Sequence, residues 1–211
     1  MKHHIFNHLQ FREIFDTKPQ VISNLLIFEQ LLIDWNQKIN LVSSSTIPNI
    51  WWRHILDSAQ ILKLFPAKSS VMLDVGSGAG FPGLIISILG FPEVHLVESN
   101  SKKVKFLSHI IEKLNLEAIV HHSRIENLNF FDVDIITARA VAPLDKLLQL
   151  TSLFVNEKNI QIYLKGESFN SELQKAKKLW EIDVLTYKSI TNPKARVLKI
   201  NKCIPLENKN G

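Results

Sequence analysis

Three glycines at alternate positions follow a short apolar run and could hold a ligand against the backbone. Val71–Val75 has the composition of a buried parallel strand, and Gly76, Gly78 and Gly80 come directly after it. Glycine permits a positive φ and lets a ligand approach more closely than a Cβ atom would allow. A strand, a glycine turn and the start of a helix are together typical of a nucleotide-binding βα unit.

An acidic residue at the end of the next strand indicates that the ligand contains a ribose. Val94–Val97 is a second apolar strand, and Glu98 closes it. In units of this kind, a carboxylate at this position binds the ribose hydroxyls. The cofactor-binding residues that this pattern predicts are Asp74, Gly76, Gly78, Gly80 and Glu98.

Two kinds of adenosine cofactor are compatible with the glycines. Gly78, Gly80 and Gly83 spell G-x-G-x-x-G, which would suit a dinucleotide. A pyrophosphate binds the free N–H groups at a helix N-terminus, but Pro82 has no N–H and Phe81 places a bulky ring beside it. S-adenosylmethionine carries no phosphate, so the D-x-G-x-G-x-G form favours this cofactor and a class I methyltransferase loop.

The alternation of apolar runs and helical patterns predicts the fold class. We expect an α/β class I (Rossmann-like) methyltransferase fold, with a seven-stranded, mostly parallel sheet and helices on both faces. Residues 1–66 are predicted to be an N-terminal helical extension packed on the core, and residues 67–211 the methyltransferase domain. A helix is expected to begin at Pro19.

A second helix is expected in the extension, capped by Thr46 and running to about Leu64. On it, Arg53 and Asp57 lie one helical turn apart. We expect them to form an exposed ion pair of little energetic weight, about 0.3 kcal/mol.

Several polar side chains follow the later strands, at the sheet edge where open α/β sheets bind ligands. The turn after the third strand places Ile125 and Glu126 where they should face the adenine. The fourth and fifth strands deliver Arg139 and Lys165 at their carboxyl ends.

Composition and charge further limit the possible functions. The chain has 211 residues, a single cysteine and no signal peptide or long apolar segment, so we expect a cytoplasmic protein without a membrane span. Residues 1–164 contain 15 basic and 15 acidic side chains, whereas residues 165–211 contain 10 and 5. This basic tail section suggests an anionic partner such as nucleic acid. His3, His4 and His8 could bind a metal, but an exposed arm is favoured and no metal site is expected.

Five motifs occur in an order and spacing that carry a family resemblance. They are NLVS (Asn40–Ser43), RHILDS (Arg53–Ser58), DVGSGAGFPG (Asp74–Gly83), ARA (Ala138–Ala140) and LKG (Leu164–Gly166). Together they closely resemble the bacterial small-subunit rRNA guanine-N7 methyltransferases, also called glucose-inhibited division protein B. The FPG ending and RHILDS are far more specific to that family than the glycines are.

The resemblance extends over about residues 20–200 and implies a reaction. A methyl group would pass from S-adenosylmethionine to N7 of one guanine in the decoding-region loop of 16S rRNA, leaving S-adenosylhomocysteine. Glu98 stands where the family usually has aspartate, and Ile125 where alanine is common. The implied cofactor positions are Gly76, Phe81, Ile125, Glu126 and Arg139.

Guanine N7 already carries an in-plane lone pair, so no general base is expected. We expect catalysis to come mainly from positioning the substrate against the cofactor. An arginine bound to both O6 and N7 would occupy the attacking lone pair, so positioning cations should bind O6 or phosphate. The residues predicted to position the substrate are Lys165, Arg139 and Arg196. Those predicted to bind RNA are Arg53, Arg124, Lys165 and Arg196.

Three other functions stay open from the sequence. A methyltransferase acting on a small molecule or protein predicts turnover without RNA and little salt dependence. A nicotinamide-dependent oxidoreductase predicts NAD binding, and a non-catalytic RNA-binding protein predicts cofactor affinity without turnover. If the substrate is 16S rRNA, we expect it within the small ribosomal subunit or an assembly intermediate, and the enzyme as a monomer.

Overall fold

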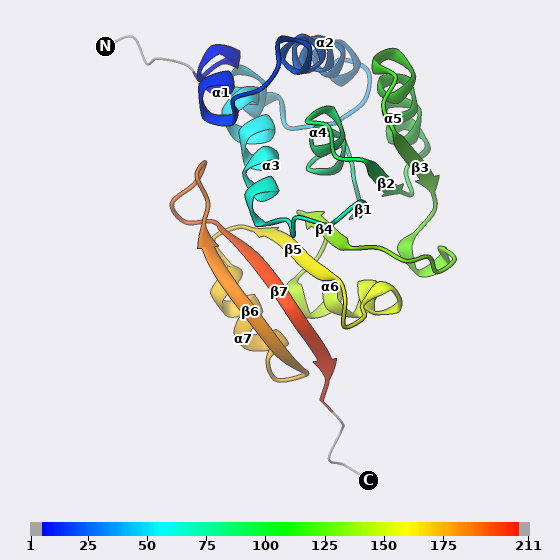
Figure 1. Ribbon diagram of the computed structural model, residues 1–211, viewed down its shortest axis with the longest axis vertical. Helices are drawn as coiled ribbons and strands as arrows, with labels where there is room; N and C mark the ends of the chain where they lie inside the picture. Colours follow the sequence, from blue (N-terminus) through cyan, green and yellow to red (C-terminus); the bar gives the residue numbers. More distant parts are fainter. Residues whose placement is uncertain (1–5, 207–211) are drawn as a thin grey trace.

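Seven strands form one sheet in the order β3-β2-β1-β4-β5-β7-β6 (Figure 1). The computed structural model describes residues 6–206. The strands are β1 (Val71–Val75), β2 (Glu93–Glu98), β3 (Ala118–His122), β4 (Ile135–Arg139), β5 (Ile160–Lys165), β6 (Trp180–Lys188) and β7 (Arg196–Pro205). The first five are parallel, and β7 is antiparallel to both of its neighbours. The predicted seven-stranded, mostly parallel sheet is confirmed.

Helices cover both faces of this sheet. They are α1 (His8–Phe15), α2 (Pro19–Asn36), α3 (Asp57–Ala59), α4 (Gly83–Ile88), α5 (Ser101–Leu114), α6 (Leu144–Thr151) and α7 (Phe169–Ala176). Short turns are η1 (Ser44–Asn49), η2 (Trp51–Leu56), η3 (Gln60–Leu64), η4 (Ile125–Asn127) and η5 (Ser152–Phe154). As predicted, α2 begins at Pro19, whose missing N–H costs nothing in the first turn.

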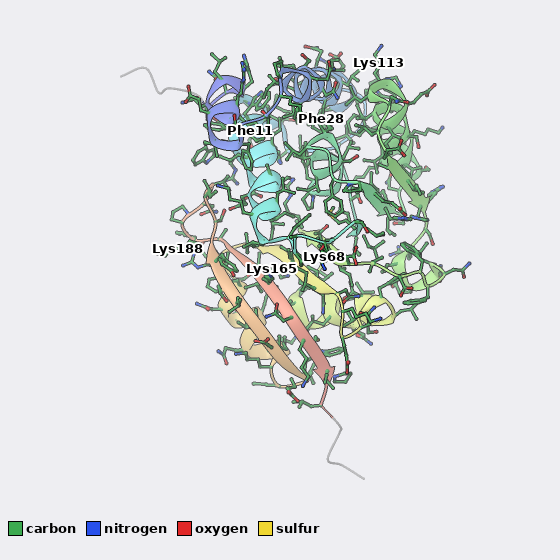
Figure 2. The ribbon with its side chains drawn as sticks, viewed as in Figure 1. Phe11, Phe28, Lys68, Lys113, Lys165 and Lys188 are labelled. Atoms are coloured by element: carbon green, nitrogen blue, oxygen red, sulfur yellow. The ribbon has the colours of Figure 1, made fainter. Side chains whose placement is uncertain are left out.

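The N-terminal helices share one apolar cluster with a single face of the sheet. Phe11 and Phe28 are fully buried in it, together with Met72 of β1 and Ile162 of β5. Figure 2 shows both phenylalanines in the helical layer above the sheet, whereas Lys113 on α5 and Lys188 on β6 lie at the margin of the molecule. The opposite face packs against α6 and α7 in a second cluster. The division at residue 66 stays a prediction.

The helix expected from Thr46 to about Leu64 is present but is not a regular α-helix. The chain stays helical from Ser44 to Leu64, as a 3₁₀ segment (η1), a π-helical turn (η2), the three-residue α3 and a second 3₁₀ segment (η3). Pro48 lies inside η1, where it lacks the N–H that a regular helix would need. Thr46 does not cap; its hydroxyl donates to the Ser43 carbonyl at 2.7 Å. A π-helical turn is rare and often marks a functional site.

The β6–β7 hairpin reaches back to the N-terminal elements. Its loop, residues 189–195, contacts the segment after η1, where the Trp52 indole donates to the Thr191 carbonyl at 2.9 Å. The Gln60 side chain accepts from the Ile190 amide, also at 2.9 Å. Two segments about 130 residues apart therefore meet beside the carboxyl ends of β4 and β5. Over residues 6–206, every helix is too short or too polar to cross a membrane.

Candidate active site

The glycine loop has the backbone conformation that its residues predict. Gly76, Gly78 and Gly80 have φ values of +65°, +59° and +90°. A Cβ on Gly80 would lie 2.6 Å from Leu84, so this glycine serves helix packing. A Cβ on Gly78 would meet nothing nearer than 3.8 Å, which leaves the space beside Gly78 open. Of the three, Gly78 is the one whose missing side chain leaves room for a ligand.

Glu98 joins the glycine loop to the end of β2. One carboxylate oxygen accepts from the Gly78 amide at 2.9 Å, and the other accepts from the Asn100 amide at 2.7 Å. The residue is only 8% exposed. A carboxylate offers about four acceptor sites, so acceptor capacity remains for a ribose hydroxyl.

Asp74 lies beneath the loop and fastens it from inside. Its carboxylate is fully buried, accepting from the Gly83 amide at 3.1 Å and from the Thr137 hydroxyl at 2.7 Å. Burial raises the pKa of this carboxyl to about 6, although the hydrogen bonds oppose the shift. Because these contacts are all within the protein interior, Asp74 acts by holding the loop in its conformation.

A cavity of about 230 Å³, the smaller cavity, opens beside the loop. Gly76, Glu98, Ile125 and Glu126 line it, as does Arg124. Ile125 is buried and supplies an apolar wall, which suits a flat purine ring. The apolar wall and the spare acceptors of Glu98, which also binds the Gly78 amide, fit an adenosine cofactor that carries no phosphate.

A second cavity of about 550 Å³, the larger cavity, lies on the other side of the loop after β4. The two share Val141 and Ala142, which form a common wall. The larger cavity is lined from the extension, the ends of β4 and β5, and the hairpin loop. Its charged residues are Arg53, Asp57, Arg139, Lys165, Glu172 and Arg196.

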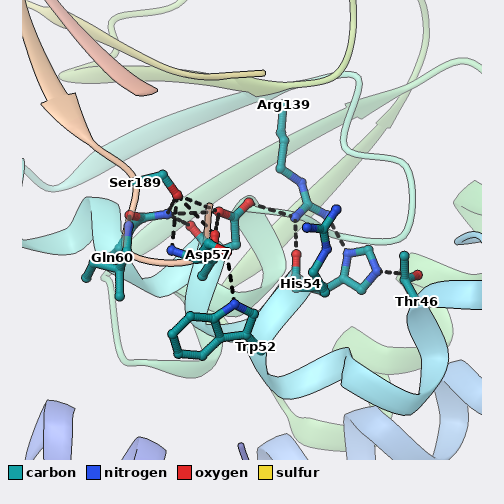
Figure 3. A network of polar contacts seen from close by, with 10 residues as sticks. Thr46, Trp52, His54, Asp57, Gln60, Arg139 and Ser189 are labelled. Atoms are coloured by element: carbon teal, nitrogen blue, oxygen red, sulfur yellow. Dashed lines mark hydrogen bonds and ion pairs between the residues drawn. The ribbon is translucent and has the colours of Figure 1, made fainter. Parts of the chain in front are cut away.

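Arg139 is held on three sides at the end of β4 (Figure 3). Its guanidinium donates to Asp57 at 3.1 Å, to the Arg53 carbonyl at 3.3 Å and to His54 at 3.1 Å. It also stacks 4.7 Å from the centre of the Phe81 ring. The expected pair between Arg53 and Asp57 is wrong, because Asp57 binds Arg139 instead. His54, in the π-helical turn, and Asp57, directly after it, both bind the same guanidinium.

His54 is a neutral link in this network. Burial, then the charges of Arg139 and Arg53, lower its pKa to about 3. Because Nδ1 faces the Arg139 donor at 3.1 Å, it must accept, and the proton must sit on Nε2. Nε2 then donates to the Thr46 hydroxyl at 2.8 Å.

Asp57 also binds the hairpin. Its other oxygen accepts from the Thr191 hydroxyl at 2.5 Å and from the Gln60 amide at 2.9 Å. A single carboxylate therefore joins the end of β4 to the β6–β7 loop. Nothing in the spacing of Asp57 and Thr191 along the chain indicates this contact.

Lys165, at the end of β5, is equally constrained. It is 8% exposed, and its ammonium donates to the Ala142 carbonyl at 2.7 Å and to Glu172 at 2.6 Å. Glu172 also accepts from the Leu144 amide and the Ser168 hydroxyl. Burial alone would raise the pKa of Glu172, but the bonds from Lys165 and Ser168 outweigh it and lower the pKa. Sequence analysis did not single out Glu172.

The other predicted residues lie in two places. Arg53 and Arg196 line the larger cavity, and Arg196 donates to the carbonyls of Pro193 and Ala195. Phe81 is buried under Arg139 rather than in the smaller cavity's lining. The structure thus brings three of the four predicted RNA-binding cations together and places Arg124 at the other cavity.

The histidines of the N-terminal arm fall partly outside the described residues. This applies to His3 and His4, whereas His8 begins α1 and packs 5.9 Å from the Trp51 ring. In residues 6–206, no three histidine, cysteine, aspartate or glutamate side chains gather as a metal site would require.

The sheet order, the glycine loop and Glu98 define a class I methyltransferase fold. The fold matches a SAM-dependent methyltransferase from Aquifex aeolicus with a TM-score of 0.56 at 18% identity, over 74% of this chain and 93% of that one. It also matches M. jannaschii TYW2, solved in complex with AdoMet, with a TM-score of 0.55 at 17% identity, over 72% and 76%. At these identities the likeness shows the fold alone.

Closer similarity is found at the level of sequence. The model of the GidB family, rRNA small subunit methyltransferase G, matches residues 21–200. The chain is 42% identical over 202 residues to the Ribosomal RNA small subunit methyltransferase G of Bartonella tribocorum, covering 91% of this chain and 94% of that protein. It is 40% identical to the protein of the same name from Rhodospirillum rubrum, covering 87% of this chain and 91% of that protein. The chain belongs to the rRNA small subunit methyltransferase G family, and the resemblance inferred from its motifs is confirmed.

Proposed function

We propose that this chain transfers a methyl group from S-adenosylmethionine to N7 of one guanine in the decoding-region loop of 16S rRNA. The observation that carries the proposal is the pair of cavities with a common wall at Val141 and Ala142. One suits an adenosine cofactor, and the other is large, cationic and open enough for a nucleotide. The family's name supports the substrate, since its members are called rRNA small subunit methyltransferases.

The cofactor, when bound, supplies a methyl carbon made electrophilic by a sulfonium. In the proposed transfer the N7 lone pair would form the new N–C bond, the C–S electron pair would return to sulfur, and the positive charge would end on the purine. No base is needed, so the residues have to position and orient. Glu98 would bind the ribose, and Ile125 would cover the adenine.

Arg139 and Lys165 would position the guanine. Arg139 uses three of its five N–H donors within the protein, and Lys165 uses two of three. The remaining donors would bind O6 or phosphate and leave N7 free to attack. Arg53 and Arg196 line the same cavity and would bind the RNA backbone; we extend this role to Arg124 beside the smaller cavity.

A labelling experiment tests the function. The protein would be incubated with methyl-labelled S-adenosylmethionine and unmethylated small ribosomal subunits, and the digested RNA searched for 7-methylguanosine. We expect label at one position. Absence of label in RNA, with cofactor binding intact, would instead support a small-molecule or protein acceptor.

The role of Lys165 is tested by separating catalysis from cofactor binding. Lys165→Ala should slow methyl transfer and leave the cofactor affinity unchanged. Lys194→Ala is a matched control, because Lys194 pairs with Glu167 on the exposed surface. A loss of cofactor affinity in Lys165→Ala would contradict the assignment.

The proposal includes the setting of the reaction. We expect a cytoplasmic monomer that acts on 16S rRNA within the small subunit or an assembly intermediate. Comparing naked 16S rRNA, assembly intermediates and complete subunits as substrates would identify the form that the enzyme uses. Analytical ultracentrifugation would report the oligomeric state.

A further inference from the structure

The larger cavity contains two carboxylates as well as its four cations. Among the described residues that line it, these are Asp57 and Glu172. Each pairs with a cation that comes directly from a strand end: Asp57 with Arg139 at 3.1 Å, and Glu172 with Lys165 at 2.6 Å. The four side chains are between 8% and 19% exposed, so solvent screens them little.

Both pairs lie against the wall that separates the two cavities. Arg139 directly precedes the loop of residues 140–143, which contains the shared Val141 and Ala142. Lys165 donates to the Ala142 carbonyl, and Glu172 accepts from the Leu144 amide at the first residue of α6. The loop thus begins directly after a residue of one pair and is bound near its end by the other pair.

We infer that Asp57 and Glu172 are positioning residues for methyl transfer: each holds a cation of the larger cavity in place and cancels its charge. This inference rests on the proposed function, in which positive charge moves from the sulfonium in the smaller cavity to the purine in the larger one. An uncompensated cation beside the purine would oppose that movement, while the same cation would still attract RNA phosphate. The carboxylates resolve this conflict.

A merely structural role makes a different prediction. If the carboxylates only stabilise the fold, neutralising them should lower stability, RNA affinity and rate together. If they control charge, neutralising them should slow the chemical step while RNA affinity stays the same or rises, because the cavity becomes more positive.

Glu172→Gln is the sharper variant because it keeps the hydrogen-bond pattern. The amide oxygen can accept from Lys165 and the Leu144 amide, and the NH₂ group can donate to the Ser168 hydroxyl. We expect the single-turnover rate at saturating RNA and cofactor to fall about ten-fold. Glu181→Gln changes the net charge equally at an exposed pair with Lys202 on β6–β7, and should leave the rate unchanged.

Asp57→Asn provides a second test at the other pair. We expect its single-turnover rate to fall too, with RNA affinity, measured by fluorescence anisotropy at fixed salt, no weaker than in wild type. Cofactor affinity, measured by calorimetry in both variants, and circular dichroism would report whether either variant loses the cofactor site or the fold.

Two outcomes would overturn the inference. One is an unchanged rate in Glu172→Gln; the other is a rate lost in proportion to RNA affinity or thermal stability. If the wild type itself methylates no RNA, the proposed function and this inference fail together. If the wild type methylates guanine N7 and Glu172→Gln matches it, only the inference fails.

Discussion

The two cavities that share the wall at Val141 and Ala142 are built in different ways. The smaller cavity is lined from short local stretches at the carboxyl ends of β1, β2 and β3, together with the loop after β4 and one face of α6. The larger cavity is lined largely by polar and charged side chains that come from the extension, two strand ends, α7 and the hairpin loop. Glu98 needs only two backbone amides to hold it, whereas Arg139 needs Asp57, His54, the Arg53 carbonyl and Phe81.

This difference indicates how each site tolerates change. The glycine turn beside the smaller cavity depends on positive φ values and on the absence of side chains, so a single added side chain can disturb it. A site made of paired charges depends on partners, so the loss of one partner leaves the other buried and uncompensated. The following predictions test this contrast, beginning with the largest effect.

Gly78→Val should block the open space beside the glycine loop. The valine would be strained at a φ of +59° and would place its side chain in the open space beside the loop. We expect cofactor affinity, measured by calorimetry, to fall at least about 100-fold, which corresponds to roughly 3 kcal/mol. Gly90→Val is the control, because Gly90 has a φ of +94° and nothing within 4 Å of its Cβ position, at the end of α4. Equal loss in both variants would show that backbone strain alone is responsible.

Arg139→Met should destabilise the protein at the larger cavity, because Asp57 loses the cation that pairs with it. It leaves the Asp57 carboxylate, 17% exposed, without its cation. We expect the free energy of unfolding, measured in urea, to fall by about 3 kcal/mol. Lys202→Met breaks an exposed pair with Glu181 and should cost less than about 1 kcal/mol. Similar losses in both would contradict a buried role for the Arg139 pair.

Acidification should change the stability contributions of the two regions in opposite directions. His54, in the larger cavity, has a pKa lowered to about 3 from 6.5, chiefly by burial. The unfolded chain therefore binds a proton that the folded one does not, and stability falls as pH drops below about 6.5. Asp74, beneath the glycine loop, has a pKa raised by burial to about 6 from 3.8, so its contribution to stability rises as pH drops through that interval.

Urea unfolding between pH 7 and pH 5 separates these contributions. His54→Gln should reduce the loss of stability on acidification, by at most about 1.4 kcal/mol per pH unit. Asp74→Asn should make the loss steeper. An unchanged slope in His54→Gln would mean that its ring titrates normally in the folded protein.

Thr191→Val should have a small effect, because it removes the hydrogen bonds that the Thr191 hydroxyl makes with Asp57 and Ser189. We expect a loss of about 1.5 kcal/mol. Hydrogen exchange of residues 189–195 should become faster, while cofactor affinity stays the same. Thr186→Val, exposed on the neighbouring β6 strand, is the control. A weaker cofactor affinity in Thr191→Val would mean that the two cavities are coupled through the hairpin.

Much of the smaller cavity could be predicted from the sequence. The strand, the glycines and Glu98 are local features, and glycine permits the positive φ values that the turn adopts. The segment from Thr46 to Leu64 was harder, since its helical period conceals a π-helical turn that depends on what it packs against. The prediction of an Arg53–Asp57 pair is wrong for the same reason, because Asp57 pairs with Arg139, which is distant in the chain.

The sequence by itself determined the order of strands and helices, the glycine turn, and which cations stand at the strand ends. Those features depend on composition and spacing within short segments. Only the tertiary structure decided which carboxylate neutralises which cation. Asp57 meets Arg139 and Thr191, and Glu172 meets Lys165, because buried charges need partners that the folded sheet, and not neighbours in the chain, brings within reach.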